Sequence, residues 1–126
     1  MAESIFHLSL NNPEEAMQFY VKAFDAKIMG VDRNSEDGSF IHAEMDIFGQ
    51  RFAFMGHESE AVTGNTMFIF FRFKNVGEEA LVKKAYKVLK EGAQPHEPFG
   101  SCFWSSCSFG LIDKYGVHWC IGYTGD

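Results

Sequence analysis

The chain uses one strand-to-helix unit twice, and this repeat constrains its fold more than any other feature. A hydrophobic strand runs into residues 12–17, Asn-Pro-Glu-Glu-Ala-Met, and another runs into residues 75–81, Asn-Val-Gly-Glu-Glu-Ala-Leu. A unit that recurs at about half the chain length indicates one supersecondary module used twice. The 126 residues suit one compact domain, so we expect a single domain, 1–126, with internal modules at 4–57 and 66–123.

Hydrophobic periodicity predicts the same order of elements in both halves, namely strand, helix and three strands. Asn12 is placed to cap the first helix, with Pro13 at its first position, and Asn75 to begin the second. The predicted strands of the first half are 5–10, 26–31, 41–47 and 51–57. In the second half a helix at 78–91 accompanies strands at 67–73, 94–98, 105–112 and 117–123. The polar residues 58–65 connect the halves, and the fold class is α+β with two βαβββ modules.

Composition excludes several classes of function. The net charge of −6 and the lack of a basic run argue against nucleic-acid binding. No apolar stretch reaches the 18 residues that a membrane span needs. Three cysteines without CxxC spacing predict reduced thiols in a cytoplasmic protein. An aromatic content of 16% indicates an aromatic-lined pocket or a buried interface.

Three segments resemble the PhnB-like branch of the vicinal oxygen chelate superfamily, which includes glyoxalase I, extradiol dioxygenases and bleomycin-resistance proteins. They are the helix at 14–26, the hairpin at 42–55 and the tail at 103–119. The resemblance implies that the two modules form a half-open mixed sheet around a cavity, with the helices on the outer face. Such a sheet needs its edges covered, which a homodimer provides.

Strand alternation and the resemblance together select the residues that line this cavity. Turning Phe6, Leu8 and Leu10 toward the helix leaves His7 for the cavity. Turning Val117, Trp119 and Ile121 toward the helix likewise leaves His118 and Cys120 for the cavity. The register of the family adds Phe68, Phe70 and Arg72 from the 67–73 strand. The candidate ligand-binding residues are His7, Glu44, Met55, Phe68, Phe70, Arg72, Trp104, His118 and Cys120.

Two of these candidates have competing interpretations. Arg72, among phenylalanines, could present its guanidinium to a ligand carboxylate or phosphate. It could also form an internal ion pair with Glu44 or Asp46. Trp104, expected beside Phe103 and Phe99, could close over a flat ligand or be buried in a dimer interface.

The resemblance also indicates where a divalent metal would be held, on the first and last strands of each module. Those positions are Ile5 or His7, Ala53 or Met55, Phe68, and Cys120. Methionine and phenylalanine cannot hold a hard divalent cation, so we expect neither a metal site of the family type nor a cofactor. A different site of His42, Glu44 and His57 stays open beside its plainer interpretation, a polar rim of the cavity.

The leading hypothesis is a metal-independent small-molecule-binding protein with Arg72 or His7 as polar anchor and no assigned catalytic residue. The alternative is a lyase, isomerase or dioxygenase that uses an atypical metal or Glu44 and His7 as acid and base. A purely structural or partner-binding dimer is the third possibility. Relatives in this branch carry a ubiquinone-pathway 3-methyltransferase label, but no glycine motif for S-adenosylmethionine is present.

Overall fold

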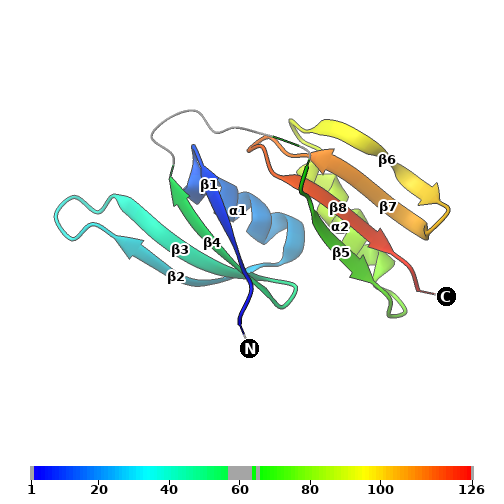
Figure 1. Ribbon diagram of the computed structural model, residues 1–126, viewed down its shortest axis with the longest axis horizontal. Helices are drawn as coiled ribbons and strands as arrows, with labels where there is room; N and C mark the ends of the chain where they lie inside the picture. The colour runs from blue at the N-terminus through cyan, green and yellow to red at the C-terminus, as the bar shows by residue number, and fades with distance from the viewer. Residues whose placement is uncertain (1, 57–63, 65, 126) are drawn as a thin grey trace. The chain divides into compact units, whose positions relative to one another are not determined.

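The computed structural model describes residues 2–56, 64 and 66–125. The chain divides into two compact units, Met1–Ala61 and Val62–Asp126. In its described part, each unit has one helix and one four-stranded sheet that contains both parallel and antiparallel pairs (Figure 1). Because strand, helix and three strands follow one another in each unit, the predicted α+β fold of two βαβββ modules is confirmed.

In the first unit, the first strand lies beside the last strand, at the edge of the sheet. Its elements are β1 (Ile5–Leu10), α1 (Pro13–Phe24), β2 (Lys27–Arg33), β3 (Phe40–Ile47) and β4 (Gln50–Gly56). The strand order is β1-β4-β3-β2, with β1 parallel to β4 and the other neighbours antiparallel. The β1–α1–β4 arrangement therefore places the helix along one face of the sheet.

Helix α1 begins where the sequence indicates, with Pro13 in its first turn. The prediction that Asn12 caps it through the side chain is wrong, because Asn12 occupies the N-cap position without a side-chain cap hydrogen bond to any described residue. An ion pair between Glu14, in the first turn, and Arg33, at the end of β2, ties the helix to the sheet. Tyr20 is fully buried, and its ring lies 6.1 Å from that of Phe54 in β4.

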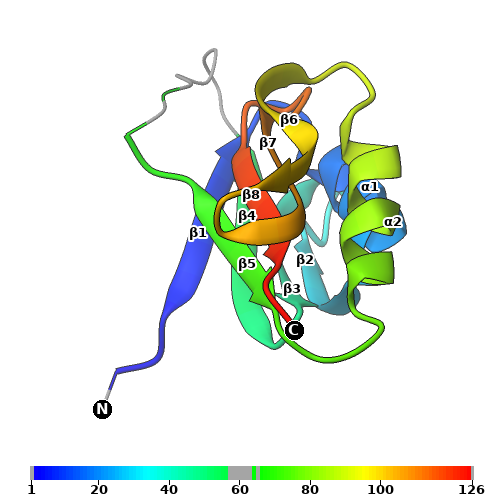
Figure 2. The same cartoon turned by 90° about the vertical axis from the view of Figure 1, so that its right-hand side faces the viewer.

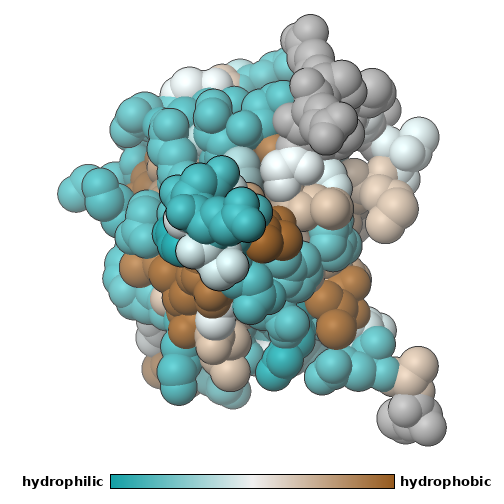
Figure 3. All heavy atoms as spheres, turned by 90° about the vertical axis from the view of Figure 1, so that its left-hand side faces the viewer, coloured by the Kyte–Doolittle hydropathy of each residue, from teal (hydrophilic) through white to brown (hydrophobic). Residues whose placement is uncertain are grey.

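The contact between Tyr20 and Phe54 identifies the face of the first sheet that packs on α1. Ala43, Met45 and Ile47 of β3 point to this face and are buried. The edge strands are less protected: Phe6 in β1 remains 39% exposed, and all of β2 is exposed. Figure 3, which views the side of the molecule with the β2–β3 hairpin, shows hydrophobic residues as separate patches among hydrophilic ones.

The second unit repeats this arrangement. Its elements are β5 (Ile69–Phe73), α2 (Glu79–Leu89), β6 (Gln94–Cys102), β7 (Ser105–Ile112) and β8 (His118–Tyr123). The strand order is β5-β8-β7-β6, with β5 parallel to β8. Helix α2 lies along one face of this sheet (Figure 2). The ring of Tyr86 in α2 is 5.1 Å from that of Phe109 in β7, which fixes the helix-packed face.

Helix α2 begins within one residue of its predicted start at Glu78, but Asn75 does not initiate it as the repeat suggests. Residues 75–78 form turns, and the helix starts at Glu79. The backbone N–H of Asn75 donates to Oε1 of Glu78 at 2.7 Å, so a carboxylate satisfies the turn instead of an asparagine cap. The two modules therefore share their order of elements but differ in how their helices start.

Strand β6 is longer than predicted, continuing past Pro98 to Cys102. Proline lacks the N–H that a strand ladder needs, so Pro95 and Pro98 suggested an early end. The strand accommodates them at the sheet edge through register shifts between Pro95 and Glu97 and between Glu97 and Gly100.

Two expectations concern residues beyond the described part. The predicted 58–65 connection lies outside the described residues except for Gly64, and so does His57.

Within the described residues, no helix combines the length and apolar character that a membrane crossing would require.

Candidate functional site

Each sheet has one face turned away from its helix, which we call its open face. The nine candidate ligand-binding residues fall into two groups on these faces. His7, Glu44 and Met55 belong to the first unit. Phe68, Phe70, Arg72, Trp104, His118 and Cys120 belong to the second.

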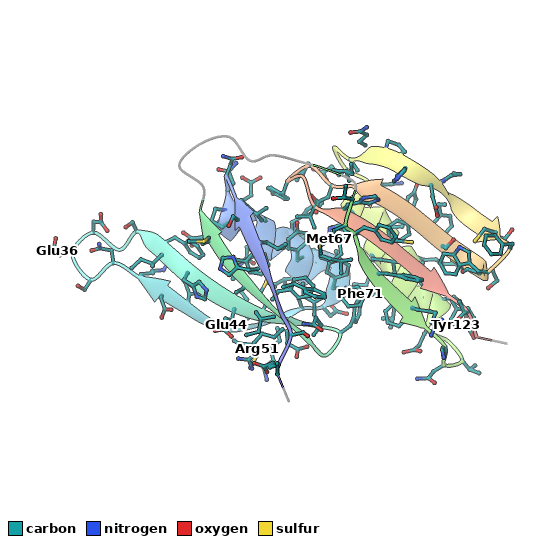
Figure 4. All side chains as sticks on the ribbon, viewed as in Figure 1. Glu36, Glu44, Arg51, Met67, Phe71 and Tyr123 are labelled. Carbon is teal, nitrogen blue, oxygen red and sulfur yellow. The ribbon has the colours of Figure 1, made fainter. Side chains whose placement is uncertain are left out.

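The open face of the first sheet contains a row of alternating polar and small residues. Strand register aligns His7 with Ala53, Ala53 with Glu44, and Glu44 with Gly30. Oε1 of Glu44 accepts a hydrogen bond from Nη1 of Arg51 at 2.8 Å (Figure 4). The negative charge of the Glu44 carboxylate is therefore balanced by a cation of its own unit, Arg51.

A pocket of about 280 Å³ lies beside this ion pair. Its lining comes from β2, β3 and β4: Met29, Gly30, Asp32, His42, Ala43, Glu44 and Arg51. Sequence reasoning missed Arg51, Asp32 and Gly30. The hairpin turn at Phe48–Gly49 was a usable signal for Arg51, because it sets the register that places Arg51 opposite Asp46, one row from Glu44.

Two histidines complete the first open face. The rings of His7 and His42 are 5.7 Å apart, and Nδ1 of His42 lies 3.8 Å from Oδ2 of Asp32. Of the alternative metal site formed by His42, Glu44 and His57, the last member is outside the described residues. Among the residues that are described, no group of three His, Cys, Asp or Glu side chains is arranged to hold a metal ion.

Strand β5 and the residue before it provide the aromatic part of the second open face. Phe68 and Phe70 are 52% and 47% exposed, and Arg72 is exposed on the same face. Register places Phe70 opposite Cys120 and Arg72 opposite Gly122. No carboxylate in the described ranges pairs with Arg72. Phe68, Phe70 and Arg72 thus present two accessible rings and a guanidinium on one face.

Trp104 lies on the same open face, above Gly122. It sits in the β6–β7 turn, and a Cβ atom added to Gly122 would come within 2.5 Å of its Cη2 atom. The indole meets the ring of Phe70 edge-on, with centroids 5.3 Å apart. The glycine therefore provides the space that the indole fills.

The expectation that Trp104 lies beside Phe99 and Phe103 is wrong. Phe99 points to the helix-packed face, where its ring stacks on Tyr86 at 4.6 Å, and Phe103 is fully exposed in the turn. The bulges of β6 shift the alternation between positions 95 and 102, so sequence spacing could not assign these faces.

Strand β8 is buried on both faces, which places His118 and Cys120 beneath other side chains. The ring of His118 lies 5.1 Å from that of Phe68 and 4.7 Å from that of His96. Burial, assisted by Glu97, raises the pKa of the Cys120 thiol to about 11. Cys120 is thus a neutral, small member of the face at physiological pH.

The three thiols are expected to differ in reactivity. Cys102 is exposed, and a hydrogen bond with Ser108 (3.5 Å, Sγ to Oγ) lowers its pKa, while burial raises the pKa of Cys107 and Cys120. A lower pKa gives more thiolate at a given pH, so iodoacetamide at about pH 8 should label Cys102 first. Peptide mass spectrometry of the native protein measures this order. Ser108→Ala should slow the labelling of Cys102, and earlier labelling of Cys120 would contradict the arrangement.

Comparison with known proteins gives one family match. Residues 3–122 match the family model described as 3-demethylubiquinone-9 3-methyltransferase. No curated protein matches the chain.

Several solved structures share the fold. A PhnB protein from Bacillus cereus, described as a putative 3-demethylubiquinone-9 3-methyltransferase, is 24% identical with a TM-score of 0.73, covering 97% of this chain and 98% of that one. A Pseudomonas aeruginosa protein is 16% identical with a TM-score of 0.80 and full coverage of both chains. A variant of the fosfomycin resistance protein FosX from Listeria monocytogenes, solved with Mn(II) and dihydroxypropylphosphonic acid, is 15% identical with a TM-score of 0.69, covering 97% and 91%. At these identities the similarity shows the fold alone.

Proposed function

We propose, from the premise that this chain belongs to the 3-demethylubiquinone-9 3-methyltransferase family within the vicinal oxygen chelate superfamily, that it binds a small ring-bearing organic acid without a metal ion. Within that superfamily we assign it to the PhnB-like branch. The observation that carries the proposal is the exposed row of Phe68, Phe70 and Arg72 on the second open face.

The chemistry of this row suits an anionic aromatic ligand. Phe68 and Phe70 leave about half of their surface accessible, and burying such rings against a ligand ring is favourable. The guanidinium of Arg72 is a planar donor fork that matches a carboxylate. A mostly apolar surface with one placed charge is the usual form of a small-molecule site.

Metal independence is proposed because the side chains that could bind a metal ion are either engaged by other residues or absent from the expected positions. Glu44 is engaged by Arg51, and His42 lies near Asp32. Of the positions that the resemblance assigns to the metal, His7 is aligned with Ala53, and Phe68 and Cys120 are those of the second unit. Alanine and phenylalanine supply no ligand atoms, so the strand pairs that hold the metal in glyoxalase-type relatives supply too few donors here.

The methyltransferase name of the family model does not determine the reaction. The sequence has no glycine-rich nucleotide motif of the kind that binds S-adenosylmethionine after a buried strand. We therefore propose binding and assign no methyl transfer to this chain.

Titration calorimetry with phenylacetate, in the presence of a chelator, tests the proposal. Replacing Arg72→Met should weaken the affinity about tenfold, because a charged hydrogen-bonding partner of the carboxylate is lost. Lys87→Met is the matched control: it removes the same charge from α2, on the other face of the sheet, and should leave the affinity unchanged. Equal weakening by both variants, or binding that requires an added divalent cation, would contradict the proposal.

An enzymatic alternative rests on the first open face. His7 and Glu44 flank Ala53 in one row beside the 280 Å³ pocket, where an acid and a base could act on one substrate. The ion pair of Glu44 with Arg51 favours a positioned carboxylate over a free base. Turnover that depends on both His7 and Glu44 would favour this alternative.

A homodimer and a cytoplasmic location are part of the same proposal. Strands β2 and β6 are edge strands of their sheets, and β2 is exposed along its whole length. Exposed edges favour pairing with a second copy. Sedimentation at several concentrations would measure the mass.

A further inference from the structure

His118 contains a buried polar atom whose role the fold does not explain. The residue is only 6% exposed, and its Nδ1 has no hydrogen-bond partner within the described part of the chain. Buried polar atoms are almost always paired, since an unpaired one gives up its hydration without compensation. An unpaired nitrogen on the open face of a binding domain is therefore a feature that a ligand could satisfy.

The surroundings of His118 place this nitrogen within the aromatic part of the face. The rings of Phe68 and His96 lie 5.1 and 4.7 Å from its ring. Cys120 is the next residue of β8 on the same face, and Phe70 lies opposite Cys120. His118 thus adjoins the phenylalanines that form the proposed ligand surface.

The imidazole is uncharged at neutral pH. Burial lowers the pKa of His118, and neighbouring His96 lowers it further, while Glu97 acts in the opposite direction. A neutral imidazole has one N–H donor and one acceptor nitrogen. It therefore suits an uncharged hydrogen-bonding group, such as a hydroxyl, better than a carboxylate.

The ring of Phe68 lies against the ring of His118, with centroids 5.1 Å apart. Phe68 precedes β5, which begins at Ile69, so the strand ladder does not hold it, and its side chain is already 52% exposed. A rotation of the Phe68 side chain could admit a ligand substituent to the imidazole while the Phe68 ring still packs on the ligand ring.

We infer that His118 is a specificity-determining contact, which selects a hydroxyl group on the ring of the bound acid, at the end opposite its carboxylate. The inference rests on the proposed function. Arg72 is aligned with Gly122, four residues along β8 from His118, or about 13 Å at the rise of a strand. The acid group and the hydroxyl must therefore lie at opposite ends of the ligand, as in a para-hydroxyaryl acid.

A matched pair of probes, 4-hydroxyphenylacetate and phenylacetate, tests the inference by calorimetry. The native protein should bind the hydroxylated acid about tenfold more tightly. His118→Phe should abolish this preference, so that the two acids bind with equal affinity, because phenylalanine has an aromatic ring but no hydrogen-bonding nitrogen. His118→Gln, which keeps a hydrogen-bonding group, should restore part of the preference.

The outcomes separate the inference from the function on which it rests. Equal binding of both acids by the native protein, with Arg72 still required, would overturn the role of His118 and leave the binding function intact. If neither acid bound, both the inference and the proposed function would be overturned. Nuclear magnetic resonance of the His118 ring nitrogens tests the inference without a variant. During the titration only the hydroxylated acid should shift the Nδ1 resonance, and an unchanged resonance would overturn the inference.

Discussion

Asp113→Ala is expected to lower the free energy of unfolding by about 3–5 kcal/mol, the largest effect of any substitution considered. The buried carboxylate of Asp113 accepts three hydrogen bonds in the turn between β7 and β8. The donors are the backbone N–H groups of Tyr115 (2.9 Å) and Val117 (3.0 Å) and Nε1 of Trp119 (2.8 Å). Alanine would leave all three donors without this acceptor, two of them on buried residues. Urea unfolding followed by circular dichroism measures the change.

The first module contains a matched control. Asp46 lies near the end of β3, just before the corresponding turn, where its Oδ1 accepts a hydrogen bond from the backbone N–H of Gly49 at 2.9 Å, in an exposed setting. Asp46→Ala should therefore cost no more than about 1 kcal/mol. Similar losses for the two variants would show that burial of the Asp113 network is not what stabilises the second unit.

Gly122→Ala is the second substitution with a large expected effect, about 2–3 kcal/mol of lost stability. The added methyl group would lie 2.5 and 2.6 Å from two atoms of the Trp104 indole and 3.1 Å from Cβ of Ser108. The indole is rigid, so it must leave the open face or push the strand. Its fluorescence should shift to longer wavelength as Trp104 becomes exposed, while Trp119, which is fully buried, serves as the reference.

The cause of this loss can be isolated with a second variant. In a Trp104→Ala background, Gly122→Ala should cost much less, because the clashing indole is absent, giving an interaction energy of about 1–2 kcal/mol. Gly110→Ala, on the same face in β7, meets Cβ of Glu97 at 3.4 Å and should be tolerated. An equal cost of Gly122→Ala in both backgrounds would mean that the glycine is needed for the strand and not for Trp104.

Much of the fold could be predicted because local signals agree with the tertiary structure. Pro13 gave the start of α1 correctly. The start of the second helix was predicted to within one residue, but Asn75 does not initiate it, because an asparagine followed by acidic residues serves equally well as a turn, as in residues 75–78. The single-domain interpretation of the two units stays a prediction.

The candidate site was less predictable, because it depends on register and on which side chains cover a strand. Phe70 and Arg72 were assigned from the family register and lie on one face of β5, but Arg51 entered the first site only through the hairpin register. Trp104 and Phe99 were assigned together, and the bulged β6 separates them onto opposite faces. No local pattern indicates that His118 has a nitrogen without a partner, because this depends on every neighbour at once.

The central claim is that the second open face binds a ring-bearing acid without a metal ion. Amide and indole resonances of ¹⁵N-labelled protein, titrated with phenylacetate first in chelator and then with an added divalent cation, test it most directly. Phe70, Arg72 and the Trp104 indole should shift equally in both conditions, and the Trp119 indole, bound to Asp113, should not. Shifts that arise only with the cation, or that spare Arg72 and Trp104, would contradict the claim.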